Sequence, residues 1–223
     1  MTGGEGDRLP AARDEVAWLA RAFGGVVTLA DPAVADPAAW PAGDILHVAA
    51  HARPHDDAPW QSAILLGRAR LTAARVAALD LDARVAVLAG CETAGGRVLT
   101  GEGIQGLSAA FLSSGVPVVV ATLWPVDDRT THDFVRRFYR ELAAGRTVSA
   151  SARAARLAVA RGVATTHPFA WAGYVVVGDG DVTVDLARRS DGTDRGRRLP
   201  IETLVVVGTI VAAVLALRRR RHD

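Results

Sequence analysis

The sequence predicts an α/β fold: an open, mostly parallel sheet with helices on both faces. Three continuous apolar runs, 44–50, 84–90 and 116–123, have the composition of strands that are covered on both faces. Segments of helical periodicity alternate with these runs, which is typical of βα units. The length of 223 residues allows one such domain with an appendage.

The elements are expected in a simple order along the chain. A first helix is expected over 14–23, where Val16, Leu19 and Phe23 recur at helical spacing before two glycines end it. The stretch 51–61 is polar, with two prolines, and is expected as a loop, and 91–100 is expected as a second loop. The remaining strands are expected at 26–29, 63–66 and 171–178, and the remaining helices at 30–43 (short), 72–79, 103–114, 127–144 and 148–161.

Composition and charge exclude several classes of protein. Cys91 is the only cysteine, which excludes a disulfide framework and any zinc site that needs two or more cysteines. Residues 188–223 carry nine arginines against four acidic residues, a net charge of +5. Residues 1–187 carry 17 arginines against 20 acidic residues, a net charge of −3. A nucleic-acid-binding domain would carry its basic stripe on the folded part, so no nucleic-acid partner is expected.

The C-terminal region predicts a membrane anchor. Residues 199–217 are almost entirely apolar, with no polar face, and are expected as a transmembrane helix. An Arg-rich linker (186–198) precedes it and a basic tail (218–223) follows it. The polar segment 1–10 has no signal-peptide pattern, so a single-pass membrane protein with a cytoplasmic domain at 11–185 is expected. A hydrophobic helix docked on a partner protein is the alternative.

Reactive side chains are expected at one edge of the sheet, because ligands bind beyond the carboxyl ends of strands in open α/β sheets. The residues just beyond the three buried runs are His51, Cys91, and Trp124 with Asp127 and Asp128. If their strands are neighbours, His51 can take the proton of the Cys91 thiol, as in a cysteine nucleophile with its base. A buried inert cysteine and a structural histidine explain the same spacing.

Other patterns have simpler explanations. Residues 101–106 match the GxGxxG pattern, but no strand directly precedes them, so no dinucleotide cofactor is expected. His47 and His51 are spaced i, i+4, but on an expected strand, so no metal is expected and His47 is interpreted as a hydrogen-bonded core residue. Asp127 and Asp128 are either helix caps or, with Trp124, part of a substrate pocket.

Several segments together resemble one family: DILHVAAHA, PWQSAILL, LTAARVAALDLDARVAVLAGCETAGG, GEGIQGLSAAFLSSGVPVVVATLWPVDD and WAGYVVVGD. They look like the CHAT domain family of caspase- and separase-like cysteine peptidases, over about 9–179. The resemblance implies a caspase-like fold with His51 as catalytic base and Cys91 as nucleophile. It also implies an oxyanion hole of the Cys91 and Ala52 backbone N–H groups, and a setting of regulated proteolysis in bacterial stress or defence.

Two departures from the family pattern favour a rival interpretation. The family usually has glycine after the catalytic histidine, and this sequence has Ala52 followed by Arg53. Relatives also have more β structure before position 9, so an N-terminally truncated domain is expected. The main expectation is a membrane-anchored cysteine endopeptidase acting on a protein or peptide, with the bilayer bound through 199–217 and a possible regulatory protein partner. The alternative is an inactive CHAT-fold scaffold or interaction module.

Overall fold

The computed structural model describes residues 10–23, 26–29, 40, 42–66, 69–89, 98–99, 103–104, 106–162, 166–186 and 204–208. Most of the expected short helix at 30–43 lies outside these residues, as do the expected linker after residue 186 and the expected basic tail.

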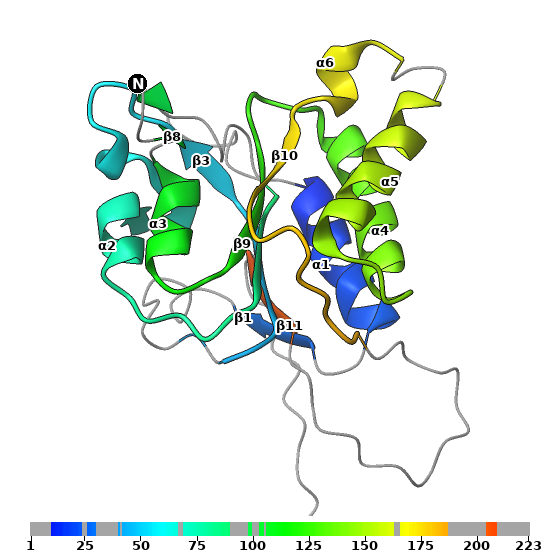
Figure 1. Cartoon of the computed structure of the whole chain (residues 1–223), viewed down its shortest axis with the longest axis horizontal. Helices are drawn as coiled ribbons and strands as arrows, with labels where there is room; N and C mark the ends of the chain where they lie inside the picture. The colour runs from blue at the N-terminus through cyan, green and yellow to red at the C-terminus, as the bar shows by residue number, and fades with distance from the viewer. Residues whose placement is uncertain are drawn as a thin grey trace, which may run out of the picture.

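A six-stranded sheet forms the centre of the α/β domain (Figure 1), in the order β1-β11-β2-β6-β9-β10. β1, β11, β2, β6 and β9 run parallel to one another. The edge strand β10 runs antiparallel to β9. The sheet is therefore mixed, and the expected mostly parallel sheet needs this correction. Its strands are Val26–Leu29 (β1), Ile45–Ala49 (β2), Val85–Leu88 (β6), Val118–Thr122 (β9), Tyr174–Gly178 (β10) and Leu204–Gly208 (β11).

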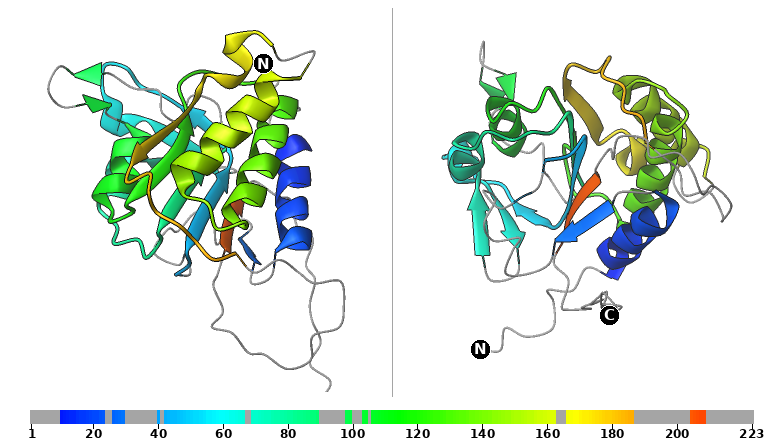
Figure 2. Two further views of the ribbon diagram at one scale, coloured as in Figure 1. Left: turned by 45° about the vertical axis from the view of Figure 1, so that its right-hand side comes forward. Right: turned by 90° about the horizontal axis from the view of Figure 1, so that it is seen from below.

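Helices cover both faces of this sheet (Figures 1 and 2). On one face lie Pro10–Ala22 (α1), Asp128–Leu142 (α4) and Val148–Ala160 (α5). On the other face lie Ala73–Ala77 (α2) and Leu107–Ser113 (α3), together with a small second sheet. β2, β6 and β9 are buried along their whole length, because each contributes alternate side chains to two hydrophobic cores.

Smaller elements complete the domain. The segment 51–61 was expected as a loop, but it begins with a short strand, His51–Arg53 (β3). β3 pairs antiparallel with Ala63–Leu66 (β4). Ala69–Thr72 (β5) pairs with the other edge of β4 and completes this three-stranded sheet. The other small elements are Pro59–Gln61 (η3), Val98–Leu99 (β7), Gly103–Ile104 (β8) and Pro168–Trp171 (α6).

The expected transmembrane helix at 199–217 is wrong. Residues 204–208 of that segment form β11, which lies between β1 and β2 and pairs with both. No helix in the described part of the chain combines the length and the apolar character that crossing a bilayer requires, which contradicts the expected single-pass membrane placement. The physical reason is that a short, Val-rich run without a polar face is also the pattern of a central parallel strand.

Candidate functional site

His51 lies directly beyond the carboxyl end of β2 and opens β3. Its backbone pairs with Leu65 of β4, and Ala52 pairs with Ile64. The His51 side chain is partly buried, and Ala52 packs against the core between the sheet and α2–α3. The antiparallel pairing to β4 therefore fixes the backbone that carries the expected catalytic base and oxyanion donor.

β2 and β6 place their carboxyl ends at the same level. The two strands are parallel neighbours, with Val48 opposite Leu88, and the Ala89 N–H donates to the Val48 carbonyl over 2.9 Å. His51 follows Val48 by three positions, and Cys91 follows Leu88 by three positions. Cys91 itself lies outside the described residues, so the expected contact between imidazole and thiol stays a prediction.

β9 is the next strand beyond β6 and runs parallel to it, so it lies beside the strand that leads to Cys91. Trp124 follows β9, and its Nε1–H donates to the Phe169 carbonyl of α6 over 2.8 Å. The Trp124 and Phe169 rings stack with their centroids 5.5 Å apart, and the Phe169 side chain stays exposed. Gly173 makes this packing possible, since a Cβ there would lie 2.9 Å from the Trp124 ring.

Asp127 is the N-cap of α4. Its carboxylate accepts hydrogen bonds from the backbone N–H groups of Arg129 (3.0 Å) and Thr130 (3.2 Å), two of the donors that a helix start leaves unpaired. Asp128 is the first residue of the helix. Of the two roles considered for Asp127, the structure therefore places the carboxylate in the capping role.

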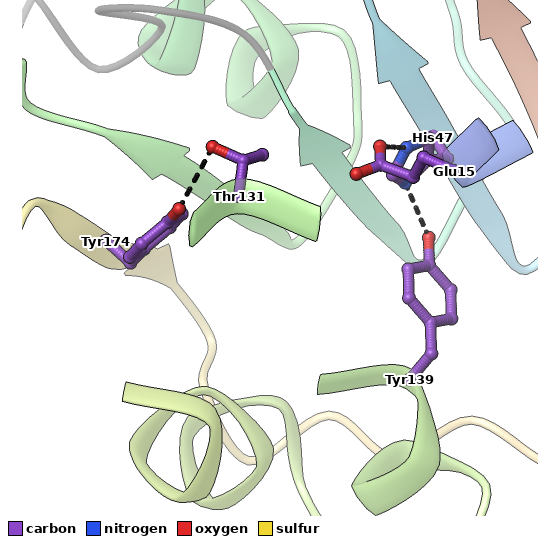
Figure 3. A network of polar contacts seen from close by, with 5 residues as sticks. All are labelled: Glu15, His47, Thr131, Tyr139 and Tyr174. Carbon is purple, nitrogen blue, oxygen red and sulfur yellow. Dashed lines mark hydrogen bonds and ion pairs between the residues drawn. The ribbon is translucent and has the colours of Figure 1, made fainter. Parts of the chain in front are cut away.

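His47 is a hydrogen-bonded core histidine, as predicted, and Figure 3 shows its two partners. Its Nε2 lies 2.7 Å from Glu15 Oε1, and its Nδ1 lies 2.9 Å from the Tyr139 hydroxyl. A neutral imidazole satisfies both contacts, with Nε2–H donating to the Glu15 carboxylate and Nδ1 accepting the Tyr139 O–H. Burial, and then the negative charge of Glu15, raise the pKa of Tyr139 well above its ordinary value.

Glu15 and Tyr139 were not singled out from the sequence. The available signal was the position of Glu15 on the apolar face of the first helix, one turn before Leu19, where a carboxylate needs a buried partner. Tyr139 offered no comparable signal, because a tyrosine on the apolar face of a helix is ordinary core.

Neither the glycine-rich motif nor the histidines form a cofactor or metal site in the described residues. Gly103 and Ile104 lie in the short antiparallel pair β7–β8, and Gly106 precedes α3 with a φ of +123°. A dinucleotide site instead needs a turn that leads directly from a parallel strand into a helix. Within the same residues, no three potential metal ligands gather.

An open α/β sheet with a histidine beyond β2, next to the strand that leads to the single cysteine, is the arrangement that the resemblance to the CHAT domain family implies. The sequence profile of the CHAT domain matches residues 4–179, most of the chain. The chain therefore belongs to the CHAT domain family, a peptidase-related family with a caspase-like fold, and the resemblance seen in the sequence is confirmed.

Two curated relatives are tetratricopeptide repeat proteins. Over 108 residues the chain is 39% identical to tetratricopeptide repeat protein 28 of Mus musculus and 35% identical to tetratricopeptide repeat protein 28 of Homo sapiens. The aligned part is 48% of this chain and only 4% of each relative. The similarity thus concerns one segment of much longer proteins.

Proposed function

We propose that this chain is a CHAT-fold interaction module that binds other proteins. The observation that carries the proposal is its similarity to proteins named for tetratricopeptide repeats. Such repeats stack into solenoids whose extended concave surfaces bind partners, so a CHAT segment shared with such proteins fits an assembly role.

The carboxyl edge of the sheet offers a surface of the kind that protein partners use. Leu123 and Phe169 are exposed there, 37% and 54% respectively, and Phe169 rests on the Trp124 ring. Large aromatic side chains held rigidly at a surface are typical anchors of protein interfaces.

A cysteine endopeptidase is the second candidate function, and the register of β2 and β6 favours it. In this mechanism His51 takes the Cys91 proton, and the thiolate attacks a peptide carbonyl carbon. The Ala52 and Cys91 backbone N–H groups hold the oxyanion, and His51 returns the proton to the amine as the C–N bond breaks. Water then hydrolyses the thioester. With Asp127 occupied as a cap, Asp128 is the acidic residue proposed to favour arginine or lysine before the cut, beside Trp124.

One experiment separates the two functions. The full chain is treated at neutral pH with a peptide-derived electrophile that labels activated thiols, and labelling of Cys91 is read by mass spectrometry. The interaction module predicts no labelling beyond that of the His51→Ala variant. Labelling that is fast in the wild type and lost in His51→Ala would establish the dyad and replace the first proposal by the second.

A further inference from the structure

β10 is an edge strand of the main sheet, and Figure 1 shows it between the two layers of helices. The Leu123 N–H donates to the Gly173 carbonyl just before this strand, over 2.9 Å. The Asp179 N–H donates to the Pro117 carbonyl just after it, also over 2.9 Å. Hydrogen-bonded and non-hydrogen-bonded pairs alternate between these two points, so the central residue, Val176, turns its N–H and C=O groups away from β9.

The outward backbone groups of Val176 have no hydrogen-bond partner in the described part of the chain. Such an edge is a template for pairing with another strand, and proteins usually protect it with charged side chains, proline or a bulge. The sequence of β10, YVVVG, contains no charge and no proline, and its register with β9 is continuous. Arg156 of α5 donates to the Tyr174 carbonyl over 3.2 Å, which covers the start of the strand but not its centre.

Positive charge borders this edge on the side of α5. Arg153, Arg156 and Leu157 are spaced i, i+3 and i+4, so they share one face of the helix. The contact of Arg156 with Tyr174 places that face beside β10. Arg153 is exposed, as is Leu157, and neither arginine forms an ion pair with a described residue. A carboxylate on this side of the edge is therefore complementary in charge.

The side of the edge that faces α3 is apolar. Val175 packs against the core between the sheet and α2–α3, and Leu112 of α3 packs against the same core. Leu112 also reaches the end of β10, since a Cβ at Gly178 would lie 2.9 Å from its side chain. Successive side chains of a strand point to opposite faces. A strand added here thus matches both sides if its acidic side chains point toward α5 and its apolar side chains toward α3.

We propose that the β10 edge binds an extended segment of a partner protein in which acidic and apolar side chains alternate. The backbone of Val176 supplies the pairing, and the alternating side chains supply the specificity, as in other cases of strand addition. The inference rests on the proposed interaction function, for which it names one surface and one partner chemistry.

A second copy of this chain is a poorer occupant of the edge, because its own α5 would accompany its β10. Neighbouring strands lie about 4.8 Å apart, whereas the axes of packed helices need about 8–10 Å. An extended segment brings no helix with it and avoids this crowding.

The test measures binding of a fluorescein-labelled peptide of alternating glutamate and valine residues to the full chain by fluorescence anisotropy. A second peptide has the same side chains but N-methylated backbone nitrogens, which removes the donors of a strand ladder. Val176→Pro removes the outward N–H of β10, at an edge position where proline is tolerated. Val176→Thr keeps the N–H and is the matched control. We expect Kd to rise about tenfold or more with the methylated peptide and in Val176→Pro, and less than about twofold in Val176→Thr.

A second pair of variants keeps the test decisive if Val176→Pro unfolds. Arg153→Glu reverses one exposed charge beside the edge and should raise Kd about fivefold or more. Arg70→Glu, the same reversal at an exposed position of β5, is its control and should change Kd less than about twofold. Equal weakening in these two variants would reduce the effect to net charge and overturn the proposal.

Three other results would overturn it as well. The first is absence of peptide binding, and the second is equal affinity for the methylated and unmethylated peptides. The third is a dimer of the chain in sedimentation that Val176→Pro dissociates and that excludes the peptide, because a second copy would then be the occupant.

The edge and the proposed function fail in different ways. If the peptide does not bind and Cys91 stays unreactive, the edge proposal is lost while an interaction role through another surface stands. If Cys91 reacts with the thiol electrophile and the peptide still pairs with β10, the interaction module is replaced by a peptidase whose edge strand recruits a partner.

Discussion

The His47 imidazole and the Glu15 carboxylate lie 2.7 Å apart in the interior and join β2 to α1. The Tyr139 hydroxyl on the other imidazole nitrogen extends the contact to α4 (Figure 3). Three elements that are distant in sequence thus meet in one polar network inside a hydrophobic core. Such a network stabilises the fold only while every member keeps its partner, because an unpaired buried polar group is costly.

Removal of Glu15 should therefore destabilise the domain strongly. Glu15→Ala leaves the His47 Nε2–H unpaired and is expected to lower the free energy of unfolding by about 1–3 kcal/mol. Glu15→Gln keeps an oxygen acceptor and should cost less, about 1–2 kcal/mol. Urea unfolding measures both. Asp14→Ala, at the exposed neighbouring position, is the control and should stay within about 0.5 kcal/mol of wild type. Equal stability of Glu15→Ala and Asp14→Ala would contradict the network.

Tyr139 should make the stability of the domain sensitive to alkaline pH. The pKa of folded Tyr139 is raised by burial and by Glu15, so the unfolded tyrosine ionises first. Its contribution is therefore fully present below about pH 10 and is lost as the pH rises toward the folded pKa, by up to about 1.4 kcal/mol per pH unit. The chain has no lysine, so few other groups titrate in this range.

Tyr139→Phe is the variant that tests this dependence. It should flatten the decline in stability above pH 10, and it should cost about 1–3 kcal/mol at neutral pH by leaving His47 Nδ1 without a donor. Tyr174→Phe, which removes a hydroxyl that donates to Thr131, is the control. An unchanged alkaline profile in Tyr139→Phe would assign the decline to another group.

Asp127 should contribute to stability as the cap of α4. Asp127→Ala removes the acceptor for two backbone N–H groups and is expected to cost about 0.5–2 kcal/mol. Asp127→Asn keeps an accepting oxygen and should be close to wild type. Thermal unfolding compares the two variants, and a loss of similar size in both would point to the charge of Asp127 and not to capping.

Gly173 should be needed for the packing of Trp124. In Gly173→Ala the new methyl group meets the indole at 2.9 Å, so the ring must shift away from the Phe169 carbonyl, at a cost of about 1–3 kcal/mol. In a Trp124→Leu background the smaller side chain leaves room, and the same substitution should cost much less. A double-mutant cycle measures this difference, and additive effects would show that the two residues do not interact.

The buried strands and the position of His51 could be predicted from the sequence. Continuous apolar runs that end in a polar residue identify central strands and their carboxyl ends, which is why β2, β6 and β9 were predicted close to their true positions. The interpretation of His47 as a core residue was correct for the same reason, since its neighbours in the run are all apolar.

Features that depend on contacts between distant segments could not be predicted from the sequence. The pairing of His51 with Leu65 makes a strand out of a polar stretch, and only the neighbouring β4 reveals it. Trp124 gains its partner from α6, 45 residues later. The clearest failure is the C-terminal run 199–217, because periodicity alone cannot distinguish a buried strand from a membrane helix when almost every residue is apolar.

The C-terminal strand β11 should be needed for the stability of the sheet. Val206 pairs with Thr28 of β1 and with His47 of β2, so this C-terminal strand fills the gap between two strands from the first quarter of the chain. A chain that ends at Thr203 leaves β2 with an unpaired edge and should lose much of its thermal stability, whereas a chain that ends at Gly208 keeps the strand.

Val206→Pro removes a backbone N–H from the middle of the sheet and should resemble the shorter chain. Hydrogen exchange of the β2 amides, from Ile45 to Ala49, reports the pairing directly. It should be faster in the chain that ends at Thr203 and in Val206→Pro, and unchanged in the chain that ends at Gly208. Equal protection and equal melting of the chains that end at Thr203 and Gly208 would show that β11 does not belong to the sheet.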